Sequence, residues 1–380
     1  MQPIPPNRLR KIRIWSHSNK LAELTECETT KQSHSLLDFA SNDYLGLSTH
    51  PNLINAAKEV MSSEGVGAGA SRLVTGSRPI HKELEGSLGS WLQRDQVLLF
   101  PSGFQANIAA VIALADRNTW VFADKFIHHS LLLGVKASGA RLSRYAHNDL
   151  SDLKKKLSLC LKKEPNRKTL VITESLFSME GTSPELEKLA KLCEHFGTQL
   201  LVDEAHALGI MGTDGKGLSY GLSSPITIIS GTFGKAFGSG GAFLASNKKI
   251  GEHLIQTSGA FRYTTALAPP LSASALAALK LIQANPHWGK ELQKQAMLWR
   301  RKLKEKNWSL PHSNSPIIPL IIGSDEKAIQ QQEKLEEKGI LTVAIRPPTV
   351  PEGKSRLRLV IRRNLPENAL SKFLLALSDS

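Results

Sequence analysis

Residues 200–206 read LLVDEAH, an apolar run that ends in Asp203 and is followed closely by His206. Similar short apolar runs recur along the middle of the chain, with stretches of helical pattern between some of them. These runs lie at 97–100, 120–123, 170–173, 226–229 and 242–245. Continuous apolar strands that alternate with helices are typical of a mostly parallel sheet covered on both faces. Ligands bind such sheets beyond the carboxyl ends of the strands, so we expect Asp203 to point into a ligand crevice.

Outside this core the pattern changes, and the 380 residues divide into three predicted parts. Residues 1–45 form a polar, irregular N-terminal segment with one short helix near its start. Residues 46–267 form a large α/β domain that begins with a helix over Pro51–Glu64, whose apolar side chains fall on one face. Residues 268–380 form a smaller α+β domain, because strand patterns alternate there with helical ones. Its elements are a long helical region after residue 267, strands at 317–322 and 356–361, and a charged helix at 325–338.

The composition excludes several classes of function. The formal net charge is +14, but the basic residues are spread along the chain and no zinc-finger or RNP-like motif accompanies them, so we expect no nucleic-acid partner. Acidic small molecules or an acidic carrier protein are the expected partners. We expect no membrane span and no secretory signal, because no apolar run is long enough. The three cysteines, Cys27, Cys160 and Cys193, suit no metal site and fit a reducing compartment such as the cytoplasm.

Two glycine-containing segments resemble nucleotide loops, but neither matches the full pattern. Residues 67–72, GAGASR, follow a helix and have Arg72 where a dinucleotide fingerprint needs glycine. Residues 231–235, GTFGK, contain a Gly-Lys pair, but Ile229 stands where the first glycine of a phosphate-binding P-loop belongs. We therefore expect neither a dinucleotide site nor a P-loop.

Lys235 is instead a candidate for covalent chemistry. It lies shortly after a predicted strand among small neighbours, which leave room for a planar group to approach, and a lysine with a lowered pKa is what Schiff-base chemistry needs. Taken alone, Lys235 is more typical of a solvated lysine in a flexible glycine loop than of a catalytic lysine. Asp203 favours the catalytic interpretation, because a carboxylate can keep a pyridinium nitrogen protonated, and His206 could reach the phenolic oxygen of the same cofactor.

Two other strand ends carry residues that suit such a cofactor. Ser102 and Gly103 follow the strand 97–100 and open a helix, whose first backbone N–H groups can bind a phosphate. His128 and His129 follow the strand 120–123, and an imidazole there could stack on a pyridine ring. Spacing alone does not choose between these two histidines.

These segments, in this order, resemble the α-oxoamine synthases, a branch of the fold-type I pyridoxal-phosphate enzymes. The resemblance covers residues 38 to 365 and rests on six pieces in family order. They are DFASNDYLGL at 38–47, Thr75-Gly76 with His81 and Leu84-Glu85, PSGF at 101–104, FSMEG at 177–181, DEAH at 203–206 and GTFGK at 231–235. The resemblance implies an α/β fold like that of aspartate aminotransferase, with a mostly parallel seven-stranded sheet in the large domain. It also implies pyridoxal 5′-phosphate as cofactor.

The resemblance assigns roles by position. Lys235 is the expected Schiff-base lysine, Asp203 the pyridinium partner and His206 the phenolic-oxygen partner. His128 matches the ring-stacking histidine better than His129, because the following residues 130–132 fix the register. The expected phosphate or ring contacts are Gly103, Phe104, Ser178 and Thr232. Thr265, in the segment 263–265, resembles the residue that reaches the phosphate of the neighbouring subunit, which implies a homodimer with its active site at the subunit interface.

The segment AIRPPTVP at 344–351 distinguishes branches of the family. It resembles the branch that condenses L-alanine with a pimeloyl thioester and releases carbon dioxide, an acyltransferase reaction of early biotin synthesis. Arg346 is then expected to hold the amino-acid carboxylate through a bidentate pair, with Thr349 near the acyl substrate and Asn42 as a further substrate contact. An arginine near the N-terminus completes the expected substrate site, and both Arg10 and Arg13 fit.

Three alternatives remain at this level. The acyl carrier can be coenzyme A or acyl carrier protein. Another α-oxoamine synthase, making aminolevulinate or aminoketobutyrate, stays open because one methyl group changes binding by only about 1–3 kcal/mol. A catalytically silent regulator on the same fold is the alternative from another class, although an intact Lys235 with Asp203 argues against it.

Overall fold

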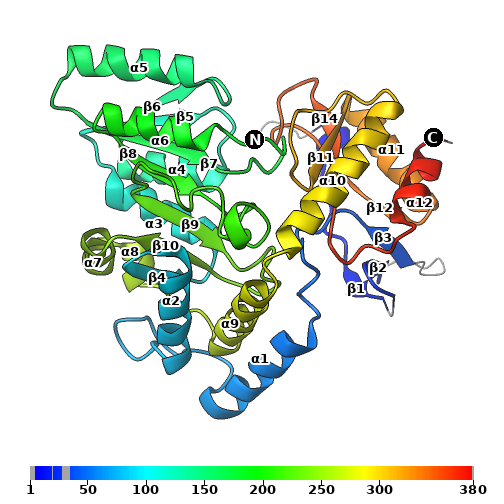
Figure 1. Ribbon diagram of the computed structural model, residues 1–380, viewed down its shortest axis with the longest axis horizontal. Helices are drawn as coiled ribbons and strands as arrows, with labels where there is room; N and C mark the ends of the chain where they lie inside the picture. Colours follow the sequence, from blue (N-terminus) through cyan, green and yellow to red (C-terminus); the bar gives the residue numbers. More distant parts are fainter. Residues whose placement is uncertain (1–4, 19, 28–34, 379–380) are drawn as a thin grey trace. The chain divides into compact units, whose positions relative to one another are not determined.

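The computed structural model describes residues 5–18, 20–27 and 35–378 (Figure 1). These residues form two compact units. The larger unit comprises Leu47–Phe177 and Ser183–Gly289, and the smaller unit comprises the described residues up to Gly46, the segment Ser178–Thr182 and the chain from Lys290 onward.

The larger unit is built around a seven-stranded sheet in the order β4-β10-β9-β8-β7-β5-β6. Only β10 runs antiparallel to its neighbours, so the predicted mostly parallel seven-stranded sheet is confirmed. The strands are β4 (Gln96–Phe100), β5 (Thr119–Asp124), β6 (Arg141–Tyr145), β7 (Lys168–Glu174), β8 (Gln199–Asp203), β9 (Ile228–Thr232) and β10 (Ala242–Ser246). The edge strand β6 has no apolar run and was not predicted, because it pairs only with β5 and most of its side chains are polar.

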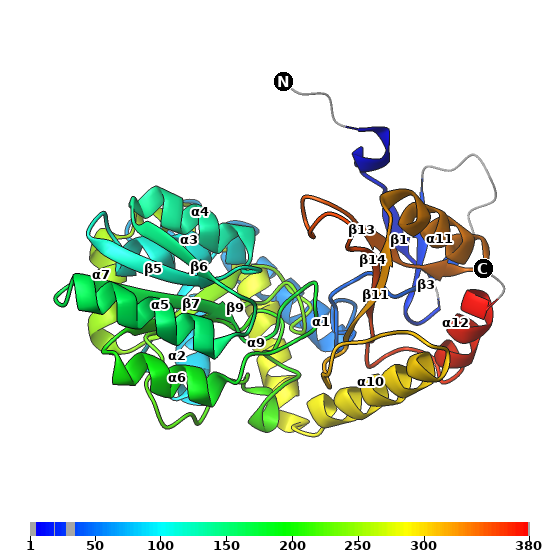
Figure 2. The same ribbon diagram turned by 90° about the horizontal axis from the view of Figure 1, so that it is seen from above.

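Helices cover both faces of this sheet, as Figure 2 shows. α3 (Gly103–Leu114) and α4 (His129–Ser138) pack together on one face, and α5 (Leu150–Lys163) and α6 (Leu186–His195) lie on the other. This arrangement follows because connections between parallel strands are right-handed. The connections through α3 and α4 proceed along the sheet in one direction, and those through α5 and α6 proceed in the other. The unit also contains α1 (Pro51–Glu64), α2 (Pro79–Leu92), η2 (Thr213–Gly215), α7 (Lys248–Thr257), α8 (Gly259–Arg262) and α9 (Pro269–Ala284).

The smaller unit contains two small sheets. One has the order β1 (Trp15–His17), β2 (Glu23–Glu26), β3 (Ser35–Asp38) and β12 (Ile340–Leu341), and the other has the order β11 (Ile317–Gly323), β14 (Ser355–Val360) and β13 (Val343–Ile345). Its helices are η1 (Pro6–Arg8), α10 (Trp288–Glu305), α11 (Asp325–Glu337) and α12 (Ala369–Ser378). The buried rings of Phe39, Trp299 and Phe373 meet in its core at centroid distances of 5.2–5.4 Å.

Apart from Ser178–Thr182, which join the smaller unit, these units differ from the predicted domain limits of 1–45, 46–267 and 268–380 in two places. The N-terminal segment joins the smaller unit, because β3 pairs in parallel with β12, with Leu37 opposite Ile340. Residues 268–289 join the larger unit, because α9 packs along α1 and α2. Both differences arise from contacts between segments that are far apart in sequence, which a local pattern does not report. Among the described residues, no helix is both long and apolar enough to cross a membrane.

Candidate active site

A cavity of about 200 Å³ lies at the carboxyl ends of β7, β8 and β9 in the larger unit. This is the position that a doubly covered parallel sheet predicts for a ligand. The cavity brings together Gly103, Phe104, His128, Asp203, His206, Thr232 and Lys235 from the predicted site. Asn107, Glu174, Ala205, Ser230 and Gly231 complete the lining.

The turn that carries Lys235 connects β9 to β10 and is anchored by buried side chains. Phe233 and Phe237, on either side of the lysine, are completely buried. The backbone closes on itself, since Gly238 N–H donates to Lys235 O at 2.9 Å and Ser239 N–H to Phe233 O at 2.9 Å. Gly238 has φ of +59°, and a Cβ there would lie 2.4 Å from the backbone nitrogen of Ser48. The glycine-rich sequence therefore builds a tight, packed turn and not a flexible loop.

Asp203 ends β8 and is 6% exposed. Its Oδ1 accepts a hydrogen bond from Ala205 N–H at 2.9 Å, and its Oδ2 accepts one from the Asn107 side-chain amide at 2.7 Å. The next residue, Glu204, turns away from the cavity to accept hydrogen bonds from Ser175 Oγ and from the backbone N–H of Ser219. Of these two adjacent acids, only Asp203 lines the cavity.

Two aromatic side chains face the cavity. The ring of Phe104, 45% exposed, lies edge-on to the ring of His128 with centroids 6.4 Å apart. Desolvation lowers the pKa of His128, the Lys235 cation lowers it further, and the Asp203 carboxylate opposes both effects. His128, as the register favoured, lines the cavity, whereas His129 is the first residue of α4 and does not.

The N-terminus of α3 supplies an anion site to the same cavity. Ser102 caps this twelve-residue helix by accepting a hydrogen bond from Gln105 N–H at 3.3 Å. The two preceding amides, of Gly103 and Phe104, belong to the first turn, where backbone N–H groups point along the axis. The hydroxyl of Thr232 is held nearby, donating to Gly241 O at 3.0 Å.

This set of groups fits pyridoxal phosphate. A carboxylate that only accepts hydrogen bonds suits a ring N–H, a helix N-terminus suits the phosphate, and an amine on a packed turn suits covalent attachment to the aldehyde. The open aromatic surfaces of Phe104 and His128 suit the face of a planar ring.

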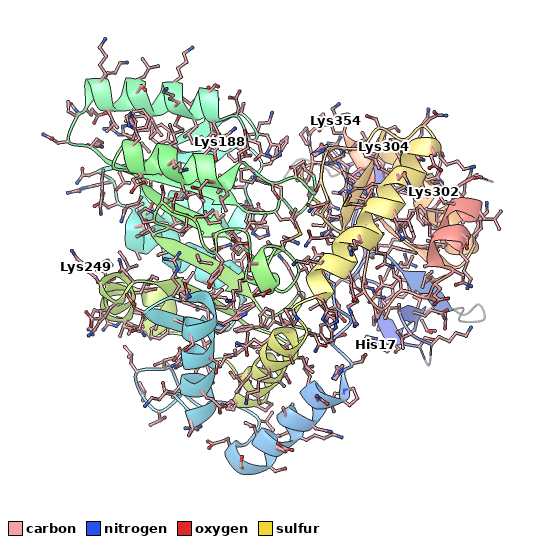
Figure 3. All side chains as sticks on the ribbon, viewed as in Figure 1. His17, Lys188, Lys249, Lys302, Lys304 and Lys354 are labelled. Carbon is pink, nitrogen blue, oxygen red and sulfur yellow. The ribbon has the colours of Figure 1, made fainter. Side chains whose placement is uncertain are left out.

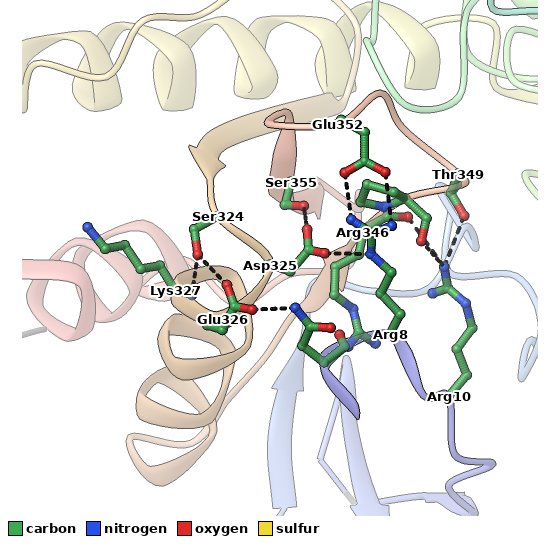
Figure 4. A network of polar contacts seen from close by, with 12 residues as sticks. Arg8, Arg10, Ser324, Asp325, Glu326, Lys327, Arg346, Thr349, Glu352 and Ser355 are labelled. Atoms are coloured by element: carbon green, nitrogen blue, oxygen red, sulfur yellow. Dashed lines mark hydrogen bonds and ion pairs between the residues drawn. The ribbon is translucent and has the colours of Figure 1, made fainter. Parts of the chain in front are cut away.

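The smaller unit brings three of the predicted substrate residues together (Figure 4). The guanidinium of Arg10 lies 3.4 Å from Thr349 Oγ1 and 3.3 Å from the carbonyl oxygen of Arg346. Arg346 donates in turn to Asn7 O at 2.5 Å. Desolvation and the Arg10 cation lower the pKa of Arg346, so the two arginines make a locally cationic site.

The structure separates Arg10 from Arg13, which the sequence left as alternatives. Arg13 forms ion pairs with Glu26 and Glu336, both at 2.7 Å, and so serves to hold the N-terminal strands to α11. The contacts described for Arg10 are neutral oxygens on the segment 346–349. Arg10 is therefore the better candidate for an anionic ligand.

Asn42 and Ser178 also lie in the smaller unit, where both contact Arg358. Its guanidinium donates to Asn42 Oδ1 at 2.8 Å and to Ser178 O at 2.6 Å. Arg358 is 5% exposed, and the two oxygens to which it donates here are neutral. Arg358 was not predicted as a site residue, although the alternation of arginine and leucine at 356–359 was a signal.

Thr265 does not line the cavity. It forms an isolated bridge with Ser71, and the neighbouring Tyr263 is 79% exposed. Asn107 and Ser130, which contact Asp203 and His128 respectively, were not predicted either. The helical spacing of Asn107 from Gly103, four residues along one face, was the available signal.

The chain matches known proteins over most of its length. The family model described as aminotransferase class I and II matches residues 34–377. The chain is 43% identical to 8-amino-7-oxononanoate synthase of Nitrosospira multiformis over 87% of its own length and 83% of the relative's. It is 38% identical to the enzyme of that name from Saccharophagus degradans, over 98% and 93%.

Solved structures agree with these relatives. The structure of 8-amino-7-oxononanoate synthase from Francisella tularensis superposes with a TM-score of 0.76 at 30% identity, covering 90% of this chain and 96% of the other. A lysine-to-alanine variant of serine palmitoyltransferase from S. paucimobilis, solved with a bound PLP-myriocin aldimine, superposes with a TM-score of 0.90 at 25% identity, covering 96% and 92%.

Proposed function

This chain belongs to the aminotransferase class I and II family and, within it, to the 8-amino-7-oxononanoate synthases, and on that premise we propose that it condenses L-alanine with a pimeloyl thioester. The products are 8-amino-7-oxononanoate, carbon dioxide and the free thiol of the carrier. The enzyme is a pyridoxal-phosphate-dependent acyltransferase. The observation that supports the chemistry best is the cavity in which Lys235, Asp203 and the N-terminus of α3 meet.

Different residues of the cavity bind different parts of the cofactor. Lys235 would attach it covalently, and the backbone of Gly103 and Phe104, with Thr232, would bind its phosphate. Ser178 keeps its sequence-based assignment as a phosphate or ring contact. Asp203 binds the ring nitrogen, His206 the phenolic oxygen, and His128 lies against the ring. When bound, pyridoxal phosphate supplies an electron sink for negative charge that develops at the substrate Cα.

The reaction also needs a base for the Cα proton of alanine. Lys235, as a free amine, would be suited to this role, because its turn holds it within the cavity. The carbon so activated attacks the thioester carbonyl, and the thiol leaves. Loss of the alanine carboxylate as carbon dioxide and return of a proton to Cα complete the balance.

Two arginines are candidates for binding the alanine carboxylate. Arg346 is the sequence-based proposal, with Arg10 and Thr349 beside it for the acyl substrate. Arg358 is a second candidate, because it is buried beside Asn42 and its described contacts are neutral oxygens. A buried guanidinium with neutral partners is stabilised by an anionic ligand.

The chain also exposes apolar side chains that suit a partner subunit. Val66, Leu73, Val74 and Tyr263 are 51–79% exposed. Since Thr265 lies near Tyr263 in sequence and outside the cavity of its own chain, we propose that it contacts the phosphate in a second copy. The active form is then a homodimer with its active sites at the subunit interface.

The deciding experiment measures carbon dioxide release from purified enzyme with two substrate pairs. L-Alanine with pimeloyl thioester, offered on both coenzyme A and acyl carrier protein, should support turnover. Glycine with succinyl-CoA, the pair of an aminolevulinate-forming relative, should be turned over at least about tenfold more slowly. A preference for the second pair, or no release with either, would overturn the proposal.

A further inference from the structure

Two buried side chains, Asn107 in the cavity lining and Ser130 on α4, link Asp203 to His128. Asn107, on α3, is 3% exposed, and Ser130, on α4, is completely buried. The Asn107 amide nitrogen lies 2.7 Å from Asp203 Oδ2 and 3.0 Å from Ser130 Oγ. Ser130 Oγ lies in turn 2.7 Å from His128 Nδ1. The proposed reaction assigns no role to Asn107 or Ser130.

The carboxylate at one end sets the direction of these hydrogen bonds. An ionised carboxylate oxygen only accepts hydrogen bonds, so the Asn107 side chain must direct its NH₂ group toward Asp203. The second hydrogen of that NH₂ group then points to Ser130 Oγ, which becomes an acceptor. The hydroxyl proton of Ser130 is left to donate elsewhere, and His128 Nδ1 is at donating distance.

A second donor reaches the same nitrogen of the imidazole. The backbone N–H of Ser130 is directed to His128 Nδ1 at 3.3 Å. A nitrogen that faces two donors must carry a lone pair and no proton, so the proton of the neutral ring resides on Nε2. Protonation of Nδ1 would turn both donors away from it.

We propose that Asn107 and Ser130 are positioning residues. The ionised Asp203 sets the direction of their hydrogen bonds, and these hydrogen bonds hold His128 as a neutral imidazole with its proton on Nε2. His128 then presents one fixed N–H donor to the cavity and places no second cation beside Lys235. The charged or titratable groups that act on His128 are Asp203, Lys235 and His129. The state of His128 follows from contacts within this chain and does not depend on which acyl substrate the enzyme uses.

The test is a nitrogen NMR titration of the full-length chain labelled in its histidines, with and without pyridoxal phosphate. The His128 signals are assigned by their loss in His128→Gln. Wild-type His128 should show the Nε2–H form. Ser130→Ala should mix the two tautomers and shift the protonation equilibrium about tenfold toward the imidazolium, as expected for the loss of one hydrogen bond to the neutral ring. Asn107→Ala should shift it in the same direction, because it frees Ser130 Oγ to accept from Nδ1–H.

Matched variants separate this role from a purely structural one. Ser138→Ala removes a hydroxyl from the other end of α4, where it donates to Val135 O, and should leave the His128 signals unchanged. Ser130→Thr keeps the hydroxyl and should restore the wild-type tautomer. An Nδ1–H form in the wild type, or identical titrations of Ser130→Ala and Ser138→Ala, would overturn the proposal. These outcomes are independent of the carbon dioxide assay, because the cofactor-free chain alone gives them.

Discussion

At the residue scale, Lys235 is asked to do two things, to anchor the cofactor and to move a proton. Lys235→Ala should therefore abolish the visible absorbance of the covalently bound cofactor and lower kcat by at least about 1,000-fold, within the range of about 10²- to 10⁴-fold that an acid–base group supplies. Lys188→Ala, which changes a lysine 69% exposed on α6, is the control. A variant at Lys235 that keeps the visible band would refute covalent attachment at this residue.

The two candidate carboxylate arginines can be distinguished by substitutions that keep the charge. Lysine cannot form the bidentate pair that arginine forms with a carboxylate. The arginine that binds alanine should, when changed to lysine, raise the KM of alanine about tenfold and leave the KM of the thioester unchanged. Arg358→Lys should in addition weaken cofactor binding, because Arg358 holds Ser178 O. If neither Arg346→Lys nor Arg358→Lys changes the KM of alanine, both assignments fail.

Individual site residues differed in how far the sequence could predict them. Asp203, His128 and Lys235 follow strand ends, so strand detection alone brought them toward one edge of the sheet. Asn107 and Arg358 could not be found that way. Their contacts join segments 96 and 316 residues apart in the chain, which only the folded backbone brings together.

At the scale of elements, His81 ties α2 to the chain that enters α9. It is completely buried, its Nδ1 accepts from Arg78 N–H at 3.0 Å, and its Nε2–H donates to Leu267 O at 2.8 Å. Burial, reinforced by Arg72 and Arg78, lowers the pKa of His81 to about 4 from 6.5. Because the folded state excludes the proton, this stability is present above pH 6.5 and is lost as the pH falls toward 4.

Urea unfolding at a series of pH values should show this loss. The free energy of unfolding should fall by on the order of 3 kcal/mol between pH 6.5 and 4 through His81 alone. His81→Gln should be less stable at neutral pH but have a flatter dependence over that interval. His253→Gln, at an exposed position of α7, should keep the wild-type slope, and equal slopes in all three proteins would contradict this account.

Elements were predicted well where local pattern and packing agree. The helix predicted over Pro51–Glu64 is α1 to the residue, because Pro51 begins it, His50 caps it and Gly65 ends it at φ +80°. The N-terminal strands β1 and β2 were missed, because most of their side chains are polar and none is fully buried. β3 was missed although three of its four residues are buried, because its apolar run is only two leucines long. Pairing with β12, some 300 residues later, stabilises them.

At the scale of the whole molecule, self-association is the first property to test. Sedimentation should give about twice the 41.6 kDa of one chain, because the apolar side chains at 66–74 and 263 are too exposed for a protein that acts alone. Val74→Asp with Tyr263→Asp should shift the equilibrium toward monomer and weaken cofactor retention, if Thr265 serves the second copy. Leu375→Asp, at an apolar position of α12 that is 66% exposed, is the control. A fully active monomer would refute the shared site.

The net charge is also a property of the whole molecule. The 48 basic and 34 acidic residues leave an excess of +14. Exposed lysines project from separate elements, among them Lys188 on α6, Lys249 on α7, and Lys302 and Lys304 on α10 (Figure 3). The positive electrostatic field of this excess charge attracts an anionic substrate over the Debye length, which is about 30 Å at 0.01 M salt and about 8 Å at 0.15 M.

Raising the salt over this range should therefore lower kcat/KM for pimeloyl-CoA about three- to tenfold with little change in kcat. The KM of zwitterionic alanine should stay constant. Pimeloyl-N-acetylcysteamine offers the matched comparison, because it keeps the reacting thioester and the distal carboxylate but lacks the phosphates of the carrier. If both thioesters lose kcat/KM equally, the salt acts on the pimeloyl carboxylate or on the protein itself, and the excess charge does not steer the carrier.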